Sequence, residues 1–231
     1  MDASLPDFAA SWEHVLTSDS ASRQLEHSQV TLVKQKLWEK YLHSFKTVAK
    51  EALNANTENE SGQAASSGAG PQSFSAFQGS IEEMKISYFV IGEKPINKGY
   101  PLYICLHGGG GTHPSVNDGQ WKHMQEYYRD SVSVGVYVAA RGITDTWNLH
   151  FVDRSYELYD KLIAYMILCW DVDPNHVYLL GYLAGGDGVY HIAPKMADRW
   201  AGVNMSAGYP NGVSLVNLYH VPFVIQVGEC V

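Results

Sequence analysis

The sequence predicts an α/β protein in which helices cover both faces of a mostly parallel β-sheet. From residue 81 onward, short apolar segments rich in β-forming residues alternate with helical segments. Parallel strands are buried on both faces, so they read as nearly continuous apolar runs. Two glycine clusters, at residues 108–111 and 185–186, each follow such a run. Because the site of an open α/β sheet lies beyond the carboxyl ends of its strands, these clusters predict where the site is.

The charged residues of the chain indicate which kinds of partner are unfavourable. Among 231 residues, 16 Lys and Arg stand against 24 Asp and Glu, which gives a net charge of −8 without any basic cluster. This balance argues against nucleic acid or an anionic membrane as the main partner. No apolar stretch is long enough to span a bilayer and no secretory signal begins the chain, so we expect a soluble, cytoplasmic protein.

The cysteines predict no disulfide framework and no zinc site. Cys105, Cys169 and Cys230 are an odd number, and no Cys-x-x-Cys spacing occurs. Cys105 and Cys169 lie in apolar runs, where a cysteine is usually a small buried side chain. We therefore expect neither a metal nor a cofactor.

The N-terminal region, residues 1–53, is predicted to be a helical arm with helices over 6–17 and 28–53. In the second helix, apolar residues recur at spacings of three and four and form one stripe. Two interpretations remain open: the stripe packs on the domain that follows, or it contacts another subunit. The stripe consists of Val30, Val33, Leu37, Tyr41, Leu42, Phe45 and Val48.

Residues 54–73 are predicted to be a flexible linker or a long surface loop. Asn, Glu, Ser, Gly and Ala dominate most of this stretch, which is typical of flexible segments. The chain therefore divides into the arm, this linker and an α/β domain over residues 74–231.

Within the α/β domain the elements follow from apolar runs, helical periodicity and Gly or Pro at their ends. The last strand is expected to form an exposed edge of the sheet, which is liable to pair with another chain. The predicted strands are 84–91, 101–106, 132–140, 176–182, 201–207 and 222–228, and the predicted helices are 119–130, 151–170 and 186–200.

Residues 181–187, Gly-Tyr-Leu-Ala-Gly-Gly-Asp, connect a predicted strand to a predicted helix. A strand that turns sharply into a helix at small residues is the layout of a nucleophile elbow, Gly-x-Ser-x-Gly. The serine position carries Leu183, which has no group able to attack a carbonyl. A second interpretation is that the glycines only allow the helix to pack closely after the strand.

A second motif, residues 107–111, reads His-Gly-Gly-Gly-Gly after an apolar strand. Glycines at such a position let the backbone approach a substrate carbonyl and direct an N–H at the developing oxyanion. The alternative is a flexible loop that His107 anchors by a structural hydrogen bond. The candidate oxyanion-hole residues are His107, Gly108, Gly109, Gly110 and Ala184.

With both motifs in place, the chain resembles the α/β-hydrolase superfamily, and within it the esterase and polyhydroxyalkanoate-depolymerase-like branch. The resemblance rests on residues 106–111, 177–187 and 196–200, and it extends over about residues 81–229. It implies an eight-stranded, mainly parallel sheet. It also implies ester hydrolysis by a Ser–His–Asp triad without a cofactor.

The sequence departs from that pattern at the residues that perform the chemistry. In this superfamily the acid follows the strand predicted at 222–228, and the histidine comes later. Only Glu229 follows that strand as a carboxylate, and no histidine comes between it and the last residue, Val231. We therefore expect a domain with its C-terminal part missing and little or no turnover. Two alternatives are an active carboxylic-ester hydrolase in a complete form of the protein, and a non-catalytic binding or oligomerisation module.

No other residue is predicted to replace the serine. Ser206 and Cys169 do not lie at an elbow, and Asp187 is expected to cap the helix or to join a buried network. A small ester-like molecule is the expected ligand, and a homo-oligomer could form through the sheet edge or the N-terminal helices. The candidate pocket residues, each of which could equally serve packing, are Asn117, Trp121, Trp147 and His150.

Overall fold

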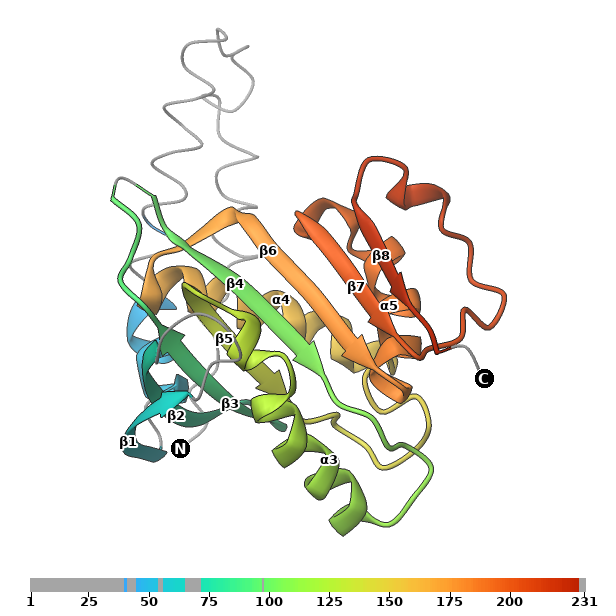
Figure 1. Ribbon diagram of the computed structural model, residues 1–231, viewed down its shortest axis with the longest axis horizontal. Coiled ribbons are helices and arrows are strands. Elements are labelled where there is room, and N and C mark those ends of the chain that lie inside the picture. Colours follow the sequence, from blue (N-terminus) through green and yellow to red (C-terminus); the bar gives the residue numbers. More distant parts are fainter. Residues whose placement is uncertain (1–39, 41–44, 54–55, 65–71, 97, 229–231) are drawn as a thin grey trace, which may run out of the picture. The chain divides into compact units, whose positions relative to one another are not determined.

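The computed structural model describes residues 40, 45–53, 56–64, 72–96 and 98–228 (Figure 1). The described residues contain one eight-stranded sheet with the order β1-β2-β3-β5-β4-β6-β7-β8. Strands β5, β4, β6, β7 and β8 are parallel, whereas β1, β2 and β3 are antiparallel to their neighbours. The predicted α/β class with a mostly parallel sheet is therefore confirmed.

Most predicted elements are present. The strands are β1 (Asn56–Ala64), β2 (Gln72–Ile81), β3 (Met84–Ile91), β4 (Tyr100–Leu106), β5 (Gly135–Ala140), β6 (Val172–Tyr182), β7 (Gly202–Ser206) and β8 (Phe223–Gln226). The longer helices are α3 (Pro114–Tyr127), α4 (Asp153–Trp170) and α5 (Ala184–Lys195). Short 3₁₀ turns occupy Arg129–Ser131, Ala197–Arg199 and Val216–Leu218.

Helices cover both faces of the sheet, as the sequence predicts. On β5, Val138 and Ala140 belong to the larger core, which includes Leu162 of α4 and residues of α5. The alternate residues Tyr137 and Ala139 belong to the second core, together with Met124 of α3. Successive side chains of a strand point to opposite faces, so α3 lies on one face and α4 and α5 lie on the other.

Much of the predicted N-terminal arm lies outside the described residues, including the helix predicted at 6–17. Within the described part, residues 45–53 are helical. Leu53 is buried in the larger core, and its carbonyl accepts a hydrogen bond from Tyr88 Oη at 3.5 Å. Val48, which was predicted to belong to the apolar stripe, is exposed. The end of this helix therefore packs on the sheet through Leu53.

The linker predicted over 54–73 requires a correction, because β1 and the start of β2 occupy much of it. β1 pairs antiparallel with β2, and β2 pairs antiparallel with β3 along its length. A hairpin ladder satisfies backbone groups whatever the side chains are, so a polar composition does not exclude a strand. In β2, Phe77 stacks on Tyr88 with ring centroids 4.9 Å apart.

Several element boundaries differ from their predictions: α5 ends at Lys195 rather than 200, and β5 begins at Gly135 rather than 132. Two further differences have identifiable reasons. Helix α3 begins at Pro114 rather than 119, because proline suits the first helical position and the His113 side chain accepts a hydrogen bond from Ser115 N–H. β6 begins at Val172 rather than 176, and a shift in its pairing with β4 accommodates the predicted turn at 173–175. β8 forms one edge of the described sheet, as predicted.

Candidate functional site

The turn between β6 and α5 is a tight elbow with Leu183 at its apex. Leu183 has φ 51° and ψ −118°, a backbone conformation that is strained for a residue with a Cβ. A Cβ added to Gly181 would lie 2.1 Å from the carbonyl oxygen of Gly185, and one added to Gly185 would lie 2.2 Å from that of Leu106. The elbow therefore excludes side chains at both glycines, as the motif predicted.

Leu183 projects beside the glycine loop. Its side chain is 40% exposed, and a Cβ built on Gly108 would lie 3.3 Å from Leu183 Cβ. The side chain carries no nucleophilic atom. The predicted nucleophile position thus lies next to the predicted oxyanion loop, and a hydrocarbon fills the space between them.

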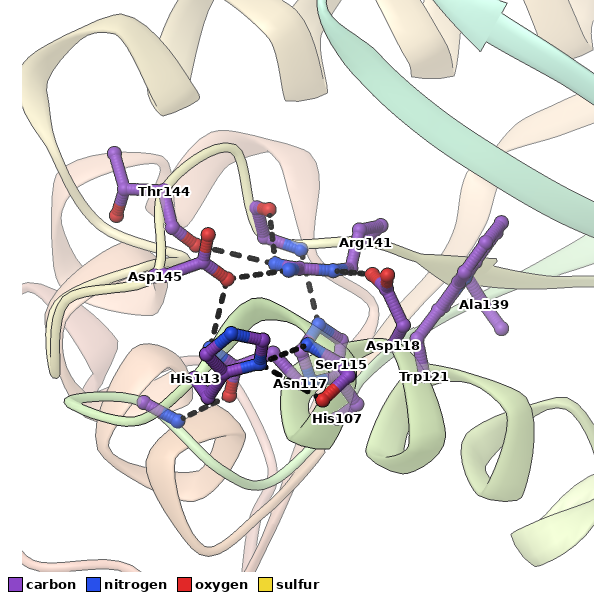
Figure 2. A network of polar contacts seen from close by, with 12 residues as sticks. His107, His113, Ser115, Asn117, Asp118, Trp121, Ala139, Arg141, Thr144 and Asp145 are labelled. Atoms are coloured by element: carbon purple, nitrogen blue, oxygen red, sulfur yellow. Dashed lines mark hydrogen bonds and ion pairs between the residues drawn. The ribbon is translucent and has the colours of Figure 1, made fainter.

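Asn117 holds the glycine loop in place. Gly109, Gly110 and Gly111 all have positive φ, and Gly110 N–H donates to Asn117 Oδ1 at 2.8 Å. Asn117 is fully buried, and its Nδ2 donates to Asp145 Oδ1 at 2.8 Å (Figure 2). The Gly110 N–H is therefore already bonded within the protein, and the buried Asn117 side chain stabilises the loop.

Arg141 joins the helix after the glycine loop to the loop after β5 (Figure 2). Its Nε donates to Asp118 Oδ1 at 2.9 Å, and its Nη1 donates to the carbonyl oxygen of Gly142 at 2.7 Å. Its Nη2 forms an ion pair with Asp145. The hydrogen bonds from Asn117 and Arg141 hold the pKa of Asp145 below its ordinary value.

Two buried histidines link the same loops. Gly142 N–H donates to His107 Nε2 at 3.1 Å, so His107 carries its proton on Nδ1, which donates to the carbonyl oxygen of Gly108 at 2.6 Å. His150 Nε2 contacts the carbonyl oxygen of His107 at 3.0 Å, and its Nδ1 contacts Tyr159 Oη at 3.2 Å. Burial lowers the pKa of His107 to about 4 and that of His150 well below its ordinary value. Both rings are therefore neutral braces at pH 7.

Asp187, in the first turn of α5, binds two further loops. It is only 3% exposed. Its Oδ1 accepts the backbone N–H of Tyr209 at 2.7 Å, and its Oδ2 accepts Trp147 Nε1 at 2.9 Å and Asn211 Nδ2 at 3.1 Å. The backbone N–H of Asp187 donates to the carbonyl oxygen of Leu183 at 3.0 Å. The carboxylate thus fixes the surroundings of the elbow.

The remaining residues considered in the sequence lie at different places around the sheet. Trp147 is half-exposed at the carboxyl edge, whereas Trp121 packs on the α3 side and donates from Nε1 to the carbonyl oxygen of Ala139 at 2.9 Å. Ala184 is buried at the start of α5. Ser206 Oγ accepts from Tyr128 Oη at 2.8 Å and donates to Gln226 Oε1 at 2.7 Å. Leu183, Gly108 and Trp147 lie at the carboxyl edge, whereas the side chains of Asn117 and His150 are buried.

The sequence analysis did not identify three residues that lie around the candidate site. Arg141 follows a buried strand, and a buried arginine needs carboxylate partners. Its position in the sequence could therefore have predicted an ion pair near the candidate site. Tyr209 and Asn211 belong to a Gly-Tyr-Pro-Asn-Gly loop after β7, also at a carboxyl end. Their partner Asp187 lies far away in sequence, so their role depends on the tertiary structure.

Neither a bilayer-spanning helix nor a metal-ligand cluster occurs among the described residues. No helix in this part of the chain is apolar over a length sufficient to traverse a bilayer. Within the same residues, no group of three or more His, Cys, Asp or Glu side chains is arranged to hold a metal ion.

Comparison with known proteins finds partial likeness to solved hydrolases. A thermostable esterase aligns with 66% of this chain at 20% identity and a TM-score of 0.45. An S-formylglutathione hydrolase from Agrobacterium tumefaciens aligns with 64% at 18% identity and 0.41, and an acetyl xylan esterase from Aspergillus awamori aligns with 58% at 11% and 0.41. The chain spans 45%, 61% and 51% of these proteins, about half of their length. No family model and no curated protein matches the sequence.

Proposed function

We propose that the chain is an esterase-like protein of the α/β-hydrolase type that binds a small ester-like ligand at the carboxyl edge and turns it over little or not at all. The observation that carries the proposal is Leu183 at the apex of the elbow, beside Gly108. The proximity of the elbow to the glycine loop supports the proposal, because an acyl-transfer site needs both segments close together. The residue at the point of attack lacks a lone pair to donate.

The neighbouring histidines support the absence of turnover. A general base needs a free ring nitrogen within hydrogen-bond reach of the nucleophile. Both nitrogens of His107 and both of His150 already have partners inside the protein. Burial also lowers the pKa of each ring, which disfavours the imidazolium that a triad must form. A serine at position 183 would therefore lack these two rings as bases.

Hydrolysis of 4-nitrophenyl butyrate by the purified chain and by Leu183→Ser tests the proposal. We expect both proteins to hydrolyse the ester far more slowly than an efficient esterase. An oxyanion hole without a triad supplies only about 10³–10⁴-fold over water, which lies far below an efficient hydrolase. We expect neither protein to be labelled by a fluorophosphonate probe. Saturable turnover or labelling of the unmodified chain would contradict the proposal.

An active carboxylic-ester hydrolase in a longer form of the protein is the second candidate. It is favoured by the strained backbone of Leu183, because strain of about 1–3 kcal/mol at an elbow is retained where chemistry uses it. Sequencing the gene across codon 183 and downstream of codon 231 tests this candidate. It requires a downstream acid and histidine in frame. An uninterrupted read with Leu183 and a stop codon after Val231 would eliminate it.

A further inference from the structure

The carboxylate of Asp187 binds two aromatic residues that are exposed to solvent. It accepts the indole N–H of Trp147 and the backbone N–H of Tyr209, which come from the loops after β5 and β7. Hydrogen bonds to a carboxylate are stronger than those between neutral groups, so both residues are held firmly. Asn211 Nδ2 adds a third bond to the same group. One buried side chain thus positions residues from two separate loops.

Both residues remain exposed to solvent. Trp147 is 50% exposed and Tyr209 is 67% exposed, although each is anchored through a polar group. Across the described part of the chain, the ring contacts include neither of these two rings. By contrast, the ring of Trp200 is buried in the core. Exposed aromatic residues that are held in place are typical of ligand-binding surfaces.

The two residues also adjoin the proposed ester site. The backbone of Trp147 packs against the glycine loop, since a Cβ built on Gly110 would lie 3.0 Å from Trp147 Cα. The loop that carries Tyr209 packs on the start of α5, where a Cβ built on Gly186 would lie 2.9 Å from Gly208 Cα. Both loops therefore lie against the segments that flank Leu183.

We propose that Trp147 and Tyr209 form an aromatic clamp, positioned by Asp187, that binds the planar aromatic group of an aryl carboxylic ester. The inference rests on the proposed function, because it places the ligand's carbonyl at the same carboxyl edge. Offset or edge-to-face contact with the two rings favours an aromatic group over a saturated ring of similar size. Asp187 acts as a positioning residue and does not touch the ligand.

Calorimetric titration with methyl benzoate and methyl cyclohexanecarboxylate tests the clamp. The two esters share the carbonyl and the methoxy group, and they differ in whether the ring is aromatic. We expect the unmodified chain to bind methyl benzoate about tenfold more tightly. Tyr209→Ala removes the ring and keeps the backbone N–H that binds Asp187, so this variant should fold and lose most of the preference. Tyr219→Ala is the matched control, because Tyr219 is exposed and its ring contacts His220 instead.

Asp187→Asn tests the positioning role through the same affinity ratio. The amide keeps the size of the side chain but can no longer accept on both sides, so we expect the aromatic preference to fall while the affinity for methyl cyclohexanecarboxylate changes little. Circular dichroism verifies the fold of each variant. Equal affinity for both esters, or a preference unaffected by Tyr209→Ala, overturns the clamp and leaves the proposed function standing. Failure of both esters to bind overturns both proposals.

Discussion

At the scale of single residues, the glycines were the most informative part of the sequence. Gly181 and Gly185 are fixed by backbone atoms about 2 Å from where a Cβ would lie, which agrees with both interpretations of the motif, an elbow and close packing of a helix after a strand. Asp187 was predicted to be a cap or a member of a buried network, and it lies in such a network. Its partners could not be predicted, because Trp147 and Tyr209 meet it only through loops distant in sequence.

The strain at Leu183 gives a stability prediction. Leu183→Gly should raise the free energy of unfolding by about 1 kcal/mol, because glycine adopts a positive φ without the clash of a Cβ and only part of the leucine side chain is buried. Urea denaturation followed by tryptophan fluorescence measures the change. Leu183→Ala is the control, since it shortens the side chain and keeps the Cβ. A gain of equal size in Leu183→Ala would show that strain is not the cause.

Burial of His107 makes stability depend on pH. Its pKa falls from an ordinary value of 6.5 in the unfolded chain to about 4 in the folded protein, chiefly because the ring is buried. The unfolded chain therefore binds more protons between these values, and stability falls as the pH is lowered from 6.5 to 4. The loss attributable to His107 is about 3 kcal/mol, and His150 acts in the same direction.

Urea midpoints measured at pH 7, 5.5 and 4.5 test this dependence. The His107→Gln variant, which does not titrate, should start from lower stability and lose less of it over the same interval. An identical pH profile in the variant would exclude His107 as a source. His123→Gln provides the control, because His123 lies on α3 outside the two-histidine brace.

At the scale of elements, all five parallel strands and the antiparallel β3 were predicted, whereas the antiparallel β1 and β2 were not. β4, β7 and β8 match their predictions within one or two residues, because apolar runs ended by Gly or Pro mark strands. β1 was missed, since its polar sequence Asn-Thr-Glu-Asn-Glu-Ser resembles a linker. Its position depends on backbone pairing with β2. Backbone pairing does not require a particular amino-acid composition, so the sequence did not reveal it.

The close packing of α5 on β4 gives a prediction at this scale. Gly185→Ala would place a Cβ 2.2 Å from the carbonyl oxygen of Leu106, which is backbone and cannot rotate away. We expect the free energy of unfolding to fall by about 3 kcal/mol. Thermal denaturation measures this loss.

Gly119→Ala is the matched control for that substitution. Gly119 lies inside α3, and nothing lies within 4 Å of a Cβ added there. Alanine should therefore raise the stability by about 0.5–1 kcal/mol, because it forms helix better than glycine. A loss of stability in both variants would contradict the packing argument.

At the scale of the whole molecule, the candidate site and the exposed edge of the sheet lie on different strands. The elbow and the glycine loop lie at the ends of β6 and β4, in the middle of the strand order, whereas β8 closes the described sheet. Val224 and Ile225 of β8 are exposed apolar side chains on that edge. The proposed homo-oligomer would therefore leave the ligand site accessible.

Self-association through β8 is directly testable. We expect the chain to form concentration-dependent oligomers in light scattering coupled to size-exclusion chromatography. Ile225→Lys should shift the population toward the monomer, because Ile225 is 56% exposed and a charge on an edge strand opposes pairing. Ile96→Lys alters an exposed isoleucine outside the sheet and should leave the distribution unchanged. A monomer at all concentrations would reject this surface as an interface.

The elbow also makes position 183 a promising point for chemical conjugation. A cysteine there would sit half-exposed at the amino end of α5, where the helix dipole stabilises a thiolate and speeds alkylation at neutral pH. Burial raises the pKa of Cys105 and Cys169, so both native thiols would react slowly. With Cys230 replaced by serine, Leu183→Cys would accept a maleimide dye or a cross-linker selectively. The same turn that would serve a nucleophile thus offers an attachment point for reporters at the carboxyl edge of the sheet.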